Sequence, residues 1–437
     1  MYTQKELKHH LTASEAKYVI STPDLMKHVE PVVDEIGTGI EPIVFSDLFK
    51  ETTPPIEPPR RTLHDLKKAA TPSDLYARLK KISPDSIATL MATSGSTGLP
   101  RLVARTHAAH LAEVKAITAR TSTNSYEARK LYCLPIHHAF TFPEAVFNAL
   151  HQGQPTYILK RFGDAFSYRI RDHEITDVMT TPNMLLELED SASADIDIKA
   201  DLQTLKTIYC GGAPLAQELR ERFLKLFHDT PKLVNVYGMT ECGWISTSDD
   251  DSRDASCVGR ILEGFEARLD ESTVSTSSHG QRIGELEVKG KQMMTGYKND
   301  RTASKDAIVL DDWLKTRDIG FLKDDQIHLL DRAKDFIKLD GFPVSPTEFE
   351  HALREITQVE DVAVISSLSN SLDEQPVIFI VRRDEGGDLT NAKVKQHLMG
   401  RMSRYKVAKC RIRFVQSIPR GEDGKTLREE MRQQLIQ

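Results

Sequence analysis

The 437-residue sequence lacks any apolar run long enough to cross a membrane, and its first twenty residues lack the apolar segment that follows a basic start in a secretory leader. Neither charge sign dominates, because 58 Lys and Arg residues accompany 64 Asp and Glu residues, and the two signs alternate along most of the chain. This balance argues against a nucleic-acid partner and against binding to an anionic membrane. The C-terminus also lacks a peroxisomal tripeptide.

Cysteine is scarce and scattered, which argues against two further classes of protein. The five cysteines have neither the spacing of metal ligands nor the even number of a disulfide framework: Cys133, Cys210, Cys242, Cys257 and Cys410. We therefore expect buried thiols in a reducing compartment, and the cytoplasm as the location.

What the sequence does contain is an alternation of strand-like and helix-like segments, which predicts an α/β fold. Residues 87–92 have the length and composition of a buried strand, and a helix is expected from 107 to about 119. A second strand, turn and helix are expected at 205–210, 211–214 and 215–227, followed by a strand at 233–237. Proline-rich, acidic and Ser/Thr-rich stretches at 53–59, 249–251 and 272–278 are expected to be surface loops.

The pattern changes from residue 335 onward, where short strands at 361–365 and 377–381 alternate with helices. This predicts a small α+β module of about a hundred residues. We therefore expect a large α/β domain over 1–333 and a second domain over 334–437.

Residues 91–101, reading MATSGSTGLPR, are the most informative stretch. Glycine lets backbone amides approach an anion closely, and hydroxyl groups donate to phosphate oxygens. The residues expected to act in this way are Thr93, Ser94, Gly95, Ser96, Thr97 and Gly98. The spacing is not that of a Walker loop. The alternative, considering the stretch alone, is a polar surface loop rich in glycine and serine.

Further motifs follow in a fixed order: LPIHH at 134–138, GGAPL at 211–215, YGMTE at 237–241, GEL at 284–286, GY at 296–297, TRD at 316–318, RAKD at 332–335, Gly341, and GK at 424–425. Together with the loop, this series resembles the adenylate-forming superfamily of acyl-CoA synthetases, adenylation domains and luciferases. It is most similar to acyl-CoA and aryl-CoA ligases of the coumarate-ligase type. The resemblance implies a large N-terminal α/β domain, a small mobile α+β lid, and ATP, Mg²⁺, a small carboxylic acid and coenzyme A as ligands.

The resemblance also implies roles for individual residues in nucleotide binding. Tyr237 of the Tyr237-Gly238 pair would stack on adenine, with Gly212 and Ala213 against the other side of the base. A core tyrosine at a strand end is the alternative. Thr240 would donate to the α-phosphate, and Glu241 would hold magnesium.

Asp318 resembles the carboxylate that accepts both ribose hydroxyls, and Arg332 the cation near the ribose and phosphate. As an isolated pair they would more often form a surface salt bridge. Lys425 is similar to the lysine that reaches the substrate carboxylate and α-phosphate during adenylation. Lys334 matches the hinge of the mobile lid.

Two further residues are implied to contact the substrates. Gly341 would let a pantetheine arm pass, and His138 would lie at the edge of the acyl pocket, although a packing histidine is an alternative. The segment 138–143 lacks the aspartate with which peptide-synthetase domains grip an amino group. An acid with an uncharged tail is therefore favoured over an α-amino acid.

The sequence also departs from the family pattern. The chain begins almost inside the motif that normally follows an additional α/β lobe, which predicts a truncated product, half of a split enzyme, or an inactive remnant. Arg101 replaces the usual loop lysine, Arg317 replaces a glycine, and Val236 replaces a glycine before the tyrosine. The string NVYG at 235–238 also resembles domains that load a carrier protein, so this acceptor stays open beside coenzyme A.

Overall fold

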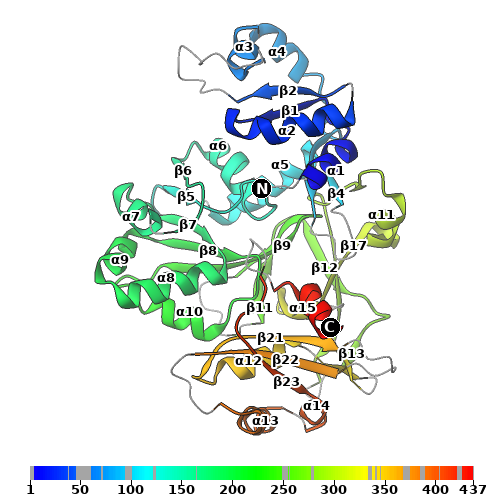
Figure 1. The fold of residues 1–437 in the computed structure, drawn as a ribbon. Coiled ribbons are helices and arrows are strands. Elements are labelled where there is room, and N and C mark those ends of the chain that lie inside the picture. Colours follow the sequence, from blue (N-terminus) through cyan, green and yellow to red (C-terminus); the bar gives the residue numbers. More distant parts are fainter. Residues whose placement is uncertain are drawn as a thin grey trace. The chain divides into compact units, whose positions relative to one another are not determined.

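The computed structural model describes residues 4–37, 39–45, 61–69, 72–93, 101–121, 125–163, 165–248, 254, 256–276, 280–332, 337–339, 342–344, 346–367, 375–383, 389–402, 404–420 and 426–436. The chain folds as two compact units, of which the first comprises Met1–Ala112 with Gln292–Ile308 and the second comprises Glu113–Lys291 with Val309–Gln437. Figure 1 labels the elements of both. Among the described residues, no helix is long and apolar enough to cross a membrane.

The first unit combines helices with two small sheets. Its elements are α1 (Gln4–Ser14), β1 (Tyr18–Ser21), α2 (Pro23–Ile36), β2 (Glu41–Val44), α3 (Leu63–Ala69), α4 (Pro72–Leu79), β3 (Ile87–Ala92), β4 (Leu102–Thr106), β15 (Gly296–Tyr297) and α11 (Arg301–Ala307). Helix α5 (His107–Thr121) begins in this unit and continues into the second. Strands β1 and β2 are parallel, and α2 packs on them through the buried Met26, Val29 and Val33. Those apolar residues recur at helical spacing, and Pro23 starts the helix where its missing N–H costs nothing.

The phosphate-loop segment joins β3 to β4, which are antiparallel neighbours in the sheet β15-β4-β3. The strand expected at 87–92 and the helix expected from His107 are confirmed, but strand β4 between them was not predicted. It was also wrong to expect a fully buried first strand, because Met91 is buried while Ile87 is 46% exposed. Strand β3 lies at the edge of this sheet, so it has a neighbouring strand on one side alone.

In the part of the second unit that the structure describes, the strands form a large mixed sheet. Its strands run in the order β12-β14-β17-β18-β11-β10-β9-β8-β7-β5-β6, with β13 and β16 paired off this path. The bounds are β5 (Lys130–Tyr132), β6 (Thr156–Ile158), β7 (Asp177–Thr180), β8 (Thr207–Gly211), β9 (Lys232–Met239), β10 (Gly243–Thr247), β11 (Cys257–Ile261), β12 (Phe265–Leu269), β13 (Ser275–Thr276), β14 (Arg282–Gly290), β16 (Ile308–Val309), β17 (Trp313–Lys323) and β18 (Gln326–Arg332). Strand β13 lies in the stretch 272–278, which was expected to be entirely loop.

Strands β6, β5, β7, β8 and β9 are parallel, and helices connect several of them. The helical segments are η1 (Pro143–Asn148), α6 (Ala149–Gln152), α7 (Ala165–Asp172), α8 (Pro182–Ala194), α9 (Ile196–Asp201), η2 (Leu202–Thr204), α10 (Gln217–Leu224) and η3 (Leu310–Asp312). Leu185 of α8 and Phe223 of α10 are fully buried in one core with Ile208 of β8. The expected strands at 205–210 and 233–237 and the helix after the turn at 211–214 are confirmed, with shifts of a few residues at their ends.

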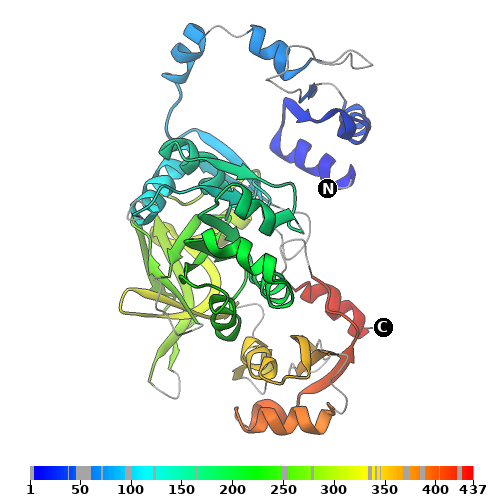
Figure 2. The same ribbon diagram turned by 90° about the vertical axis from the view of Figure 1, so that its left-hand side faces the viewer.

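The C-terminal residues form the predicted α+β module, with elements β19 (Ile337–Leu339), β20 (Phe342–Val344), α12 (Pro346–Arg354), β21 (Val359–Ser367), β22 (Gln375–Arg382), α13 (Asn391–Met399), α14 (Arg404–Ala408), β23 (Arg411–Val415) and α15 (Arg428–Ile436). The sheet β21-β22-β23 is covered by α12, α13 and α14 on one face and by α15 on the other (Figures 1 and 2). The mixed α/β fold class is therefore confirmed.

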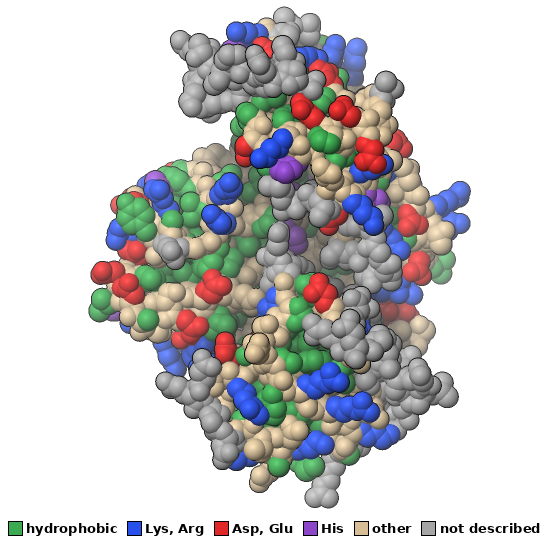
Figure 3. Space-filling view, in the orientation of Figure 1, with side chains coloured by type: hydrophobic (Ala, Val, Ile, Leu, Met, Phe, Trp, Pro, Cys, Tyr) green, Lys and Arg blue, Asp and Glu red, His purple; other side chains and the backbone are tan. Residues whose placement is uncertain are grey.

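Lys and Arg side chains gather on the visible face of this C-terminal module (Figure 3). Strand β23 lies at the edge of its sheet and carries the exposed Arg411 and Arg413, which alternate with the less exposed Ile412 and Phe414. Charged side chains on an edge strand discourage another chain from extending the sheet. Protection of the edge strand β23 thus explains Arg411 and Arg413 without a binding partner.

Candidate active site

Several predicted site residues follow the carboxyl ends of neighbouring parallel strands in the second unit. His138 follows β5, Gly212 and Ala213 follow β8, and Thr240 with Glu241 follow β9. Because the carboxyl ends of parallel strands lie along one edge of a sheet, these residues share that edge. Strand β5 pairs with β6 on one side and β7 on the other, so the chain order reverses there, as it does at ligand-binding crevices of α/β sheets.

Two of the predicted nucleotide-binding residues contact each other directly. The hydroxyl of Tyr237 donates a hydrogen bond to Oδ2 of Asp318 over 2.6 Å, and both side chains are buried. Burial and the adjacent carboxylate raise the pKa of Tyr237 well above its usual value, so the hydroxyl stays protonated as a donor. A carboxylate oxygen has two lone pairs, and Asp318 therefore keeps acceptor capacity. Tyr237 is 8% exposed, which leaves a small part of its surface open to solvent.

Thr240 and Glu241 lie in the tight turn that joins β9 to β10, and both are half-buried. Gly238 and Gly243 make the turn possible. A Cβ on Gly238 would lie 2.3 Å from the carbonyl oxygen of Gly243, which is closer than any side chain tolerates. Gly243 itself has φ of +74°, in the left-handed region that favours glycine. The sequence motif thus encodes a compact hairpin with a threonine and a glutamate at its tip.

Gly212 and Ala213 form the turn after β8. Gly212 has φ of +85° and is exposed, whereas Ala213 is half-buried. At the end of β8, a Cβ on Gly211 would lie 2.9 Å from the Val236 carbonyl oxygen and 3.0 Å from the Phe140 ring. The glycine pair thus permits close packing followed by a sharp change of chain direction.

His138 is half-buried, and its Nδ1 accepts a hydrogen bond from the backbone N–H of Phe140 over 3.3 Å. Accepting through Nδ1 leaves Nε2 to carry the proton of a neutral ring. The contact fixes the orientation of the imidazole within its own loop. The assignment to the edge of the acyl pocket stays a prediction.

Arg317, which stands where the family pattern has glycine, has φ of +63°. A residue with a side chain adopts this backbone conformation only at a cost in free energy, because its Cβ crowds the backbone. Glycine has no Cβ and avoids this cost. The structure thus gives a conformational reason for the glycine of the pattern. Asp318 follows directly, and its N–H donates to Oγ1 of Thr316 over 3.1 Å.

The phosphate-loop segment belongs to the first unit. The N–H of Thr93 donates to the carbonyl oxygen of Arg101 over 2.9 Å, which closes the base of the loop. The Arg101 guanidinium lies 3.2 Å from Oδ2 of Asp300 and 5.5 Å from the centroid of the Tyr297 ring. The GY motif at 296–297 therefore contacts the base of the phosphate loop, a relation that the sequence did not reveal.

Eight of the predicted site residues lie outside the described residues: Ser94, Gly95, Ser96, Thr97, Gly98, Lys334, Gly341 and Lys425. Arg332 lies in β18, where its backbone pairs with Asp318 of β17. Across the described ranges, no group of three His, Cys, Asp or Glu side chains is placed to hold a metal ion. Glu241 offers a single carboxylate, which suits a magnesium ion that takes its remaining ligands from phosphates and water.

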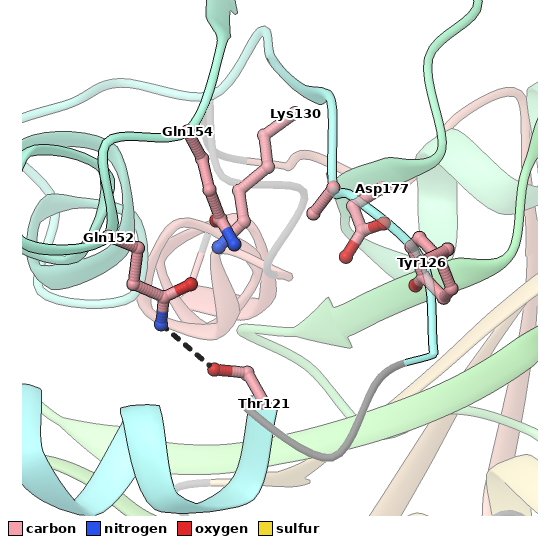
Figure 4. Close-up of a pocket in the computed structure, with 7 residues that line it drawn as sticks. Thr121, Tyr126, Lys130, Gln152, Gln154 and Asp177 are labelled. Carbon is pink, nitrogen blue, oxygen red and sulfur yellow. Dashed lines mark hydrogen bonds between the residues drawn. The ribbon is translucent and has the colours of Figure 1, made fainter.

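A polar cavity of about 110 Å³ lies at the opposite, amino-end edge of the parallel strands (Figure 4). Lys130 and Asp177 begin β5 and β7, and Lys130 Nζ lies 2.5 Å from Oε2 of the buried Glu144. Burial raises the pKa of Asp177. Gln152 donates to Thr121 across this cavity over 3.3 Å. The cavity is therefore separate from the motif residues at the carboxyl ends.

Known proteins resemble this chain over nearly its whole length. A family model for AMP-binding enzymes matches residues 1–298, and one for the C-terminal domain of AMP-binding enzymes matches 348–425. The chain belongs to the AMP-binding enzyme family. This confirms the resemblance inferred from the ordered motifs.

The relatives of this AMP-binding enzyme include ligases from fungi and plants. It is 38% identical to acyl-CoA ligase M9 of Phoma sp., with 99% of this chain and 81% of that protein aligned. Acyl-CoA ligase clz12 of Cochliobolus lunatus is 39% identical over 76% of this chain and 96% of its own length. The ATP-bound MatB structure from Rhodopseudomonas palustris superposes with a TM-score of 0.80 at 23% identity, covering 99% of this chain and 82% of that one. This last similarity supports the fold alone.

We predict that Tyr237→Phe weakens ATP binding about tenfold, because the ring remains but the buried Asp318 carboxylate loses a donor. Isothermal titration of ATP in the absence of acid measures the change. Tyr126→Phe is the matched control, since its hydroxyl also makes a 2.6 Å bond, to Thr207 at the amino-end edge. Equal losses of affinity in the two variants would contradict a specific role for Tyr237.

We predict that Arg317→Gly raises the free energy of unfolding by about 1 kcal/mol, because glycine accepts the left-handed backbone without strain. Urea unfolding followed by tryptophan fluorescence tests this. Arg317→Ala keeps a Cβ and should give no such gain. If alanine stabilises as much as glycine, the backbone strain is not the cause.

Proposed function

We propose that this enzyme is an AMP-forming acid–thiol ligase that makes acyl-CoA. In the first step, the carboxylate of an acid attacks the α-phosphorus of ATP, the bond to the β-phosphate breaks, and acyl-AMP and pyrophosphate form. In the second step, the thiol of coenzyme A attacks the acyl carbon, AMP leaves, and the thiol proton passes to solvent. The near-full-length similarity to relatives named acyl-CoA ligases supports this reaction.

The geometric observation that carries the proposal is the hydrogen bond between Tyr237 and Asp318. It links the motif proposed for adenine with the motif proposed for ribose, although 81 positions separate the two residues in sequence. A stacking ring beside a carboxylate suits a nucleoside, because the base offers a flat apolar face and the ribose offers two hydroxyl donors. Arg332, paired with Asp318 through the backbone, is proposed to add a cation near the ribose and phosphate.

The first step brings two anions together, so its barrier depends on groups that neutralise charge on the α-phosphate. Thr240 is proposed to donate to an α-phosphate oxygen, while the hydroxyls and amides of residues 93–98 hold the other phosphates. Glu241 is proposed to bind Mg²⁺, which would supply positive charge to the phosphates when bound. Lys425 is proposed to place its ammonium between the substrate carboxylate and the α-phosphate.

The second step is proposed to use a different position of the C-terminal domain. We propose domain boundaries at 1–333 and 334–437, with Lys334 as the hinge and Gly341 on the face that admits the pantetheine arm. The C-terminal helices and sheet have their own apolar core, which supports movement of this part as a body.

The acid is proposed to be aromatic or medium-chain aliphatic. Residues 138–143 carry no aspartate for an amino group, and the buried Val236 replaces a glycine of the coumarate-ligase pattern that the sequence resembles. Similar proteins include a phenylacetyl-CoA ligase of Aspergillus niger and a 4-coumarate–CoA ligase of Oryza sativa. Phenylacetate and 4-coumarate therefore belong in the first panel of acids. We propose the cytoplasm as the location because all five cysteines are buried and none forms a disulfide.

Pyrophosphate release over this panel, with and without coenzyme A, tests the proposal. Acid-dependent release together with acyl-CoA product is expected. If a phosphopantetheinylated carrier protein is acylated while coenzyme A never is, the alternative acceptor is correct. Nucleotide binding without release for any acid would instead identify an inactive remnant.

We predict that Lys425→Ala lowers the rate of adenylation by about two to three orders of magnitude, because the step loses a cation at the point where charge accumulates. Thioester formation from supplied acyl-adenylate should remain largely intact. Single-turnover assays of each half-reaction provide the measurement. Equal damage to both halves would contradict this role for Lys425.

We predict the opposite pattern for Lys334→Pro, since proline fixes φ and removes a backbone donor at the proposed hinge. Acyl-adenylate should still form, while transfer to coenzyme A falls sharply. The same pair of assays measures both steps. Unchanged transfer would show that the hinge lies elsewhere or that the domain does not swing.

A further inference from the structure

We propose that Glu113 is a positioning residue for adenylation, because its buried carboxylate holds the hairpin whose tip carries Thr240 and Glu241. This inference rests on the proposed function of those two residues. Glu113 belongs to α5 and to none of the sequence motifs. It acts through the backbone of the hairpin and touches no substrate.

The carboxylate of Glu113 packs directly against the β10 end of the turn. The side chain has 0% exposure, and its Oε1 accepts a hydrogen bond from the backbone N–H of Trp244 over 3.1 Å. A Cβ on Gly243 would lie 1.9 Å from the same oxygen. The absence of a side chain at Gly243 therefore makes room for this carboxylate.

The hairpin needs an acceptor at this point because its ladder is irregular. The pairing register between β9 and β10 shifts between Trp244 and Ser246. Such irregularities leave backbone groups without their regular ladder partners and redirect nearby side chains. Glu113 supplies a charged acceptor from a helix, and hydrogen bonds to charged groups are stronger than those between neutral groups.

Trp244 extends the link to the segment that carries His138. Its indole Nε1 donates to the carbonyl oxygen of Phe140 over 2.8 Å, and its ring lies 5.8 Å from the rings of both Phe140 and Tyr209. One buried tryptophan thus joins α5, the middle of β8, and the loop after β5 to the β9–β10 turn. Displacing its amide would move the proposed phosphate and magnesium contacts relative to the acyl-binding segment.

A merely structural buried glutamate would lower stability when replaced, so stability alone cannot test the proposal. Glu113→Leu removes the acceptor, whereas Glu113→Gln keeps an oxygen that can accept the Trp244 N–H. The side chain of Glu113→Asp is one methylene shorter, which moves the carboxylate away from the Trp244 N–H. This variant replaces the leucine variant in the test if the latter fails to fold. Thr118→Val is the matched control, because Thr118 lies on the same helix and donates to Asn148 over 2.8 Å.

Five quantities are measured on each full-length variant: the thermal midpoint, kcat and KM for acid-dependent pyrophosphate release, the dependence of that release on Mg²⁺ concentration, and the rate of thioester formation from supplied acyl-adenylate. We expect Glu113→Leu, or Glu113→Asp in its place, to lower kcat at least tenfold and to require more Mg²⁺. Transfer from supplied acyl-adenylate should stay within about twofold of wild type. Glu113→Gln should recover most of kcat, and Thr118→Val should leave both half-reactions unchanged.

The proposal is overturned if kcat survives in the acceptor-free variant, if both half-reactions fall together, or if glutamine is as defective as leucine. A wild-type chain that releases no pyrophosphate with any acid would overturn the proposed function, and this inference with it. Normal wild-type turnover with unaffected Glu113 variants would instead overturn this inference alone.

Discussion

The parallel alignment of β5, β7, β8 and β9 is the constraint on which the described site in the second unit depends. Each strand delivers the residue after its carboxyl end to the same edge of the sheet, whatever the distance along the chain. His138, Gly212 and Thr240 are brought to one edge by this rule alone. Hydrogen bonding between the strands therefore brings residues that are distant in sequence to one edge, and the loops after the strands carry the proposed functional groups.

Buried polar contacts then fix more closely the positions of the residues that the sheet brings together. Tyr237 and Asp318 meet across strands β9 and β17, which are not adjacent in the sheet, while Glu113 and Trp244 join a helix to the hairpin. Both contacts pair a donor with a carboxylate away from water. A buried carboxylate without a donor would be costly, so each pair admits few alternative arrangements. The geometry of the candidate site is thus tied to the interior of the second unit.

The alternation of apolar segments and the order of motifs in the sequence were sufficient to predict the fold class, the family and strands β3, β8 and β9. These predictions succeeded because apolar periodicity and glycine spacing are local properties that fold in place. The contacts that join distant segments were not predictable in this way. Glu113 sits among ordinary helix residues, and Lys130 and Glu144 are charged residues that a pattern of burial would place outside. Strand β4 was missed because its five residues adjoin the glycine-rich loop, and because Arg105 within it, now 1% exposed, does not look like a core residue.

The buried ion pair between Lys130 and Glu144 anchors the amino end of β5, at the sheet edge away from the motifs. Such a pair is rigid once formed, since breaking it would leave a charge in the interior. The amino end of β5 is therefore fixed by a contact that stabilises the fold, whereas the loop after its carboxyl end can vary in sequence. The length and the residues of the loops after β5 and β8 can therefore change during evolution to suit a new acid without destabilising the strands that carry these loops. When one end of a strand stabilises the fold and the other end carries a variable loop, a family can keep a common nucleotide chemistry while its members activate different acids.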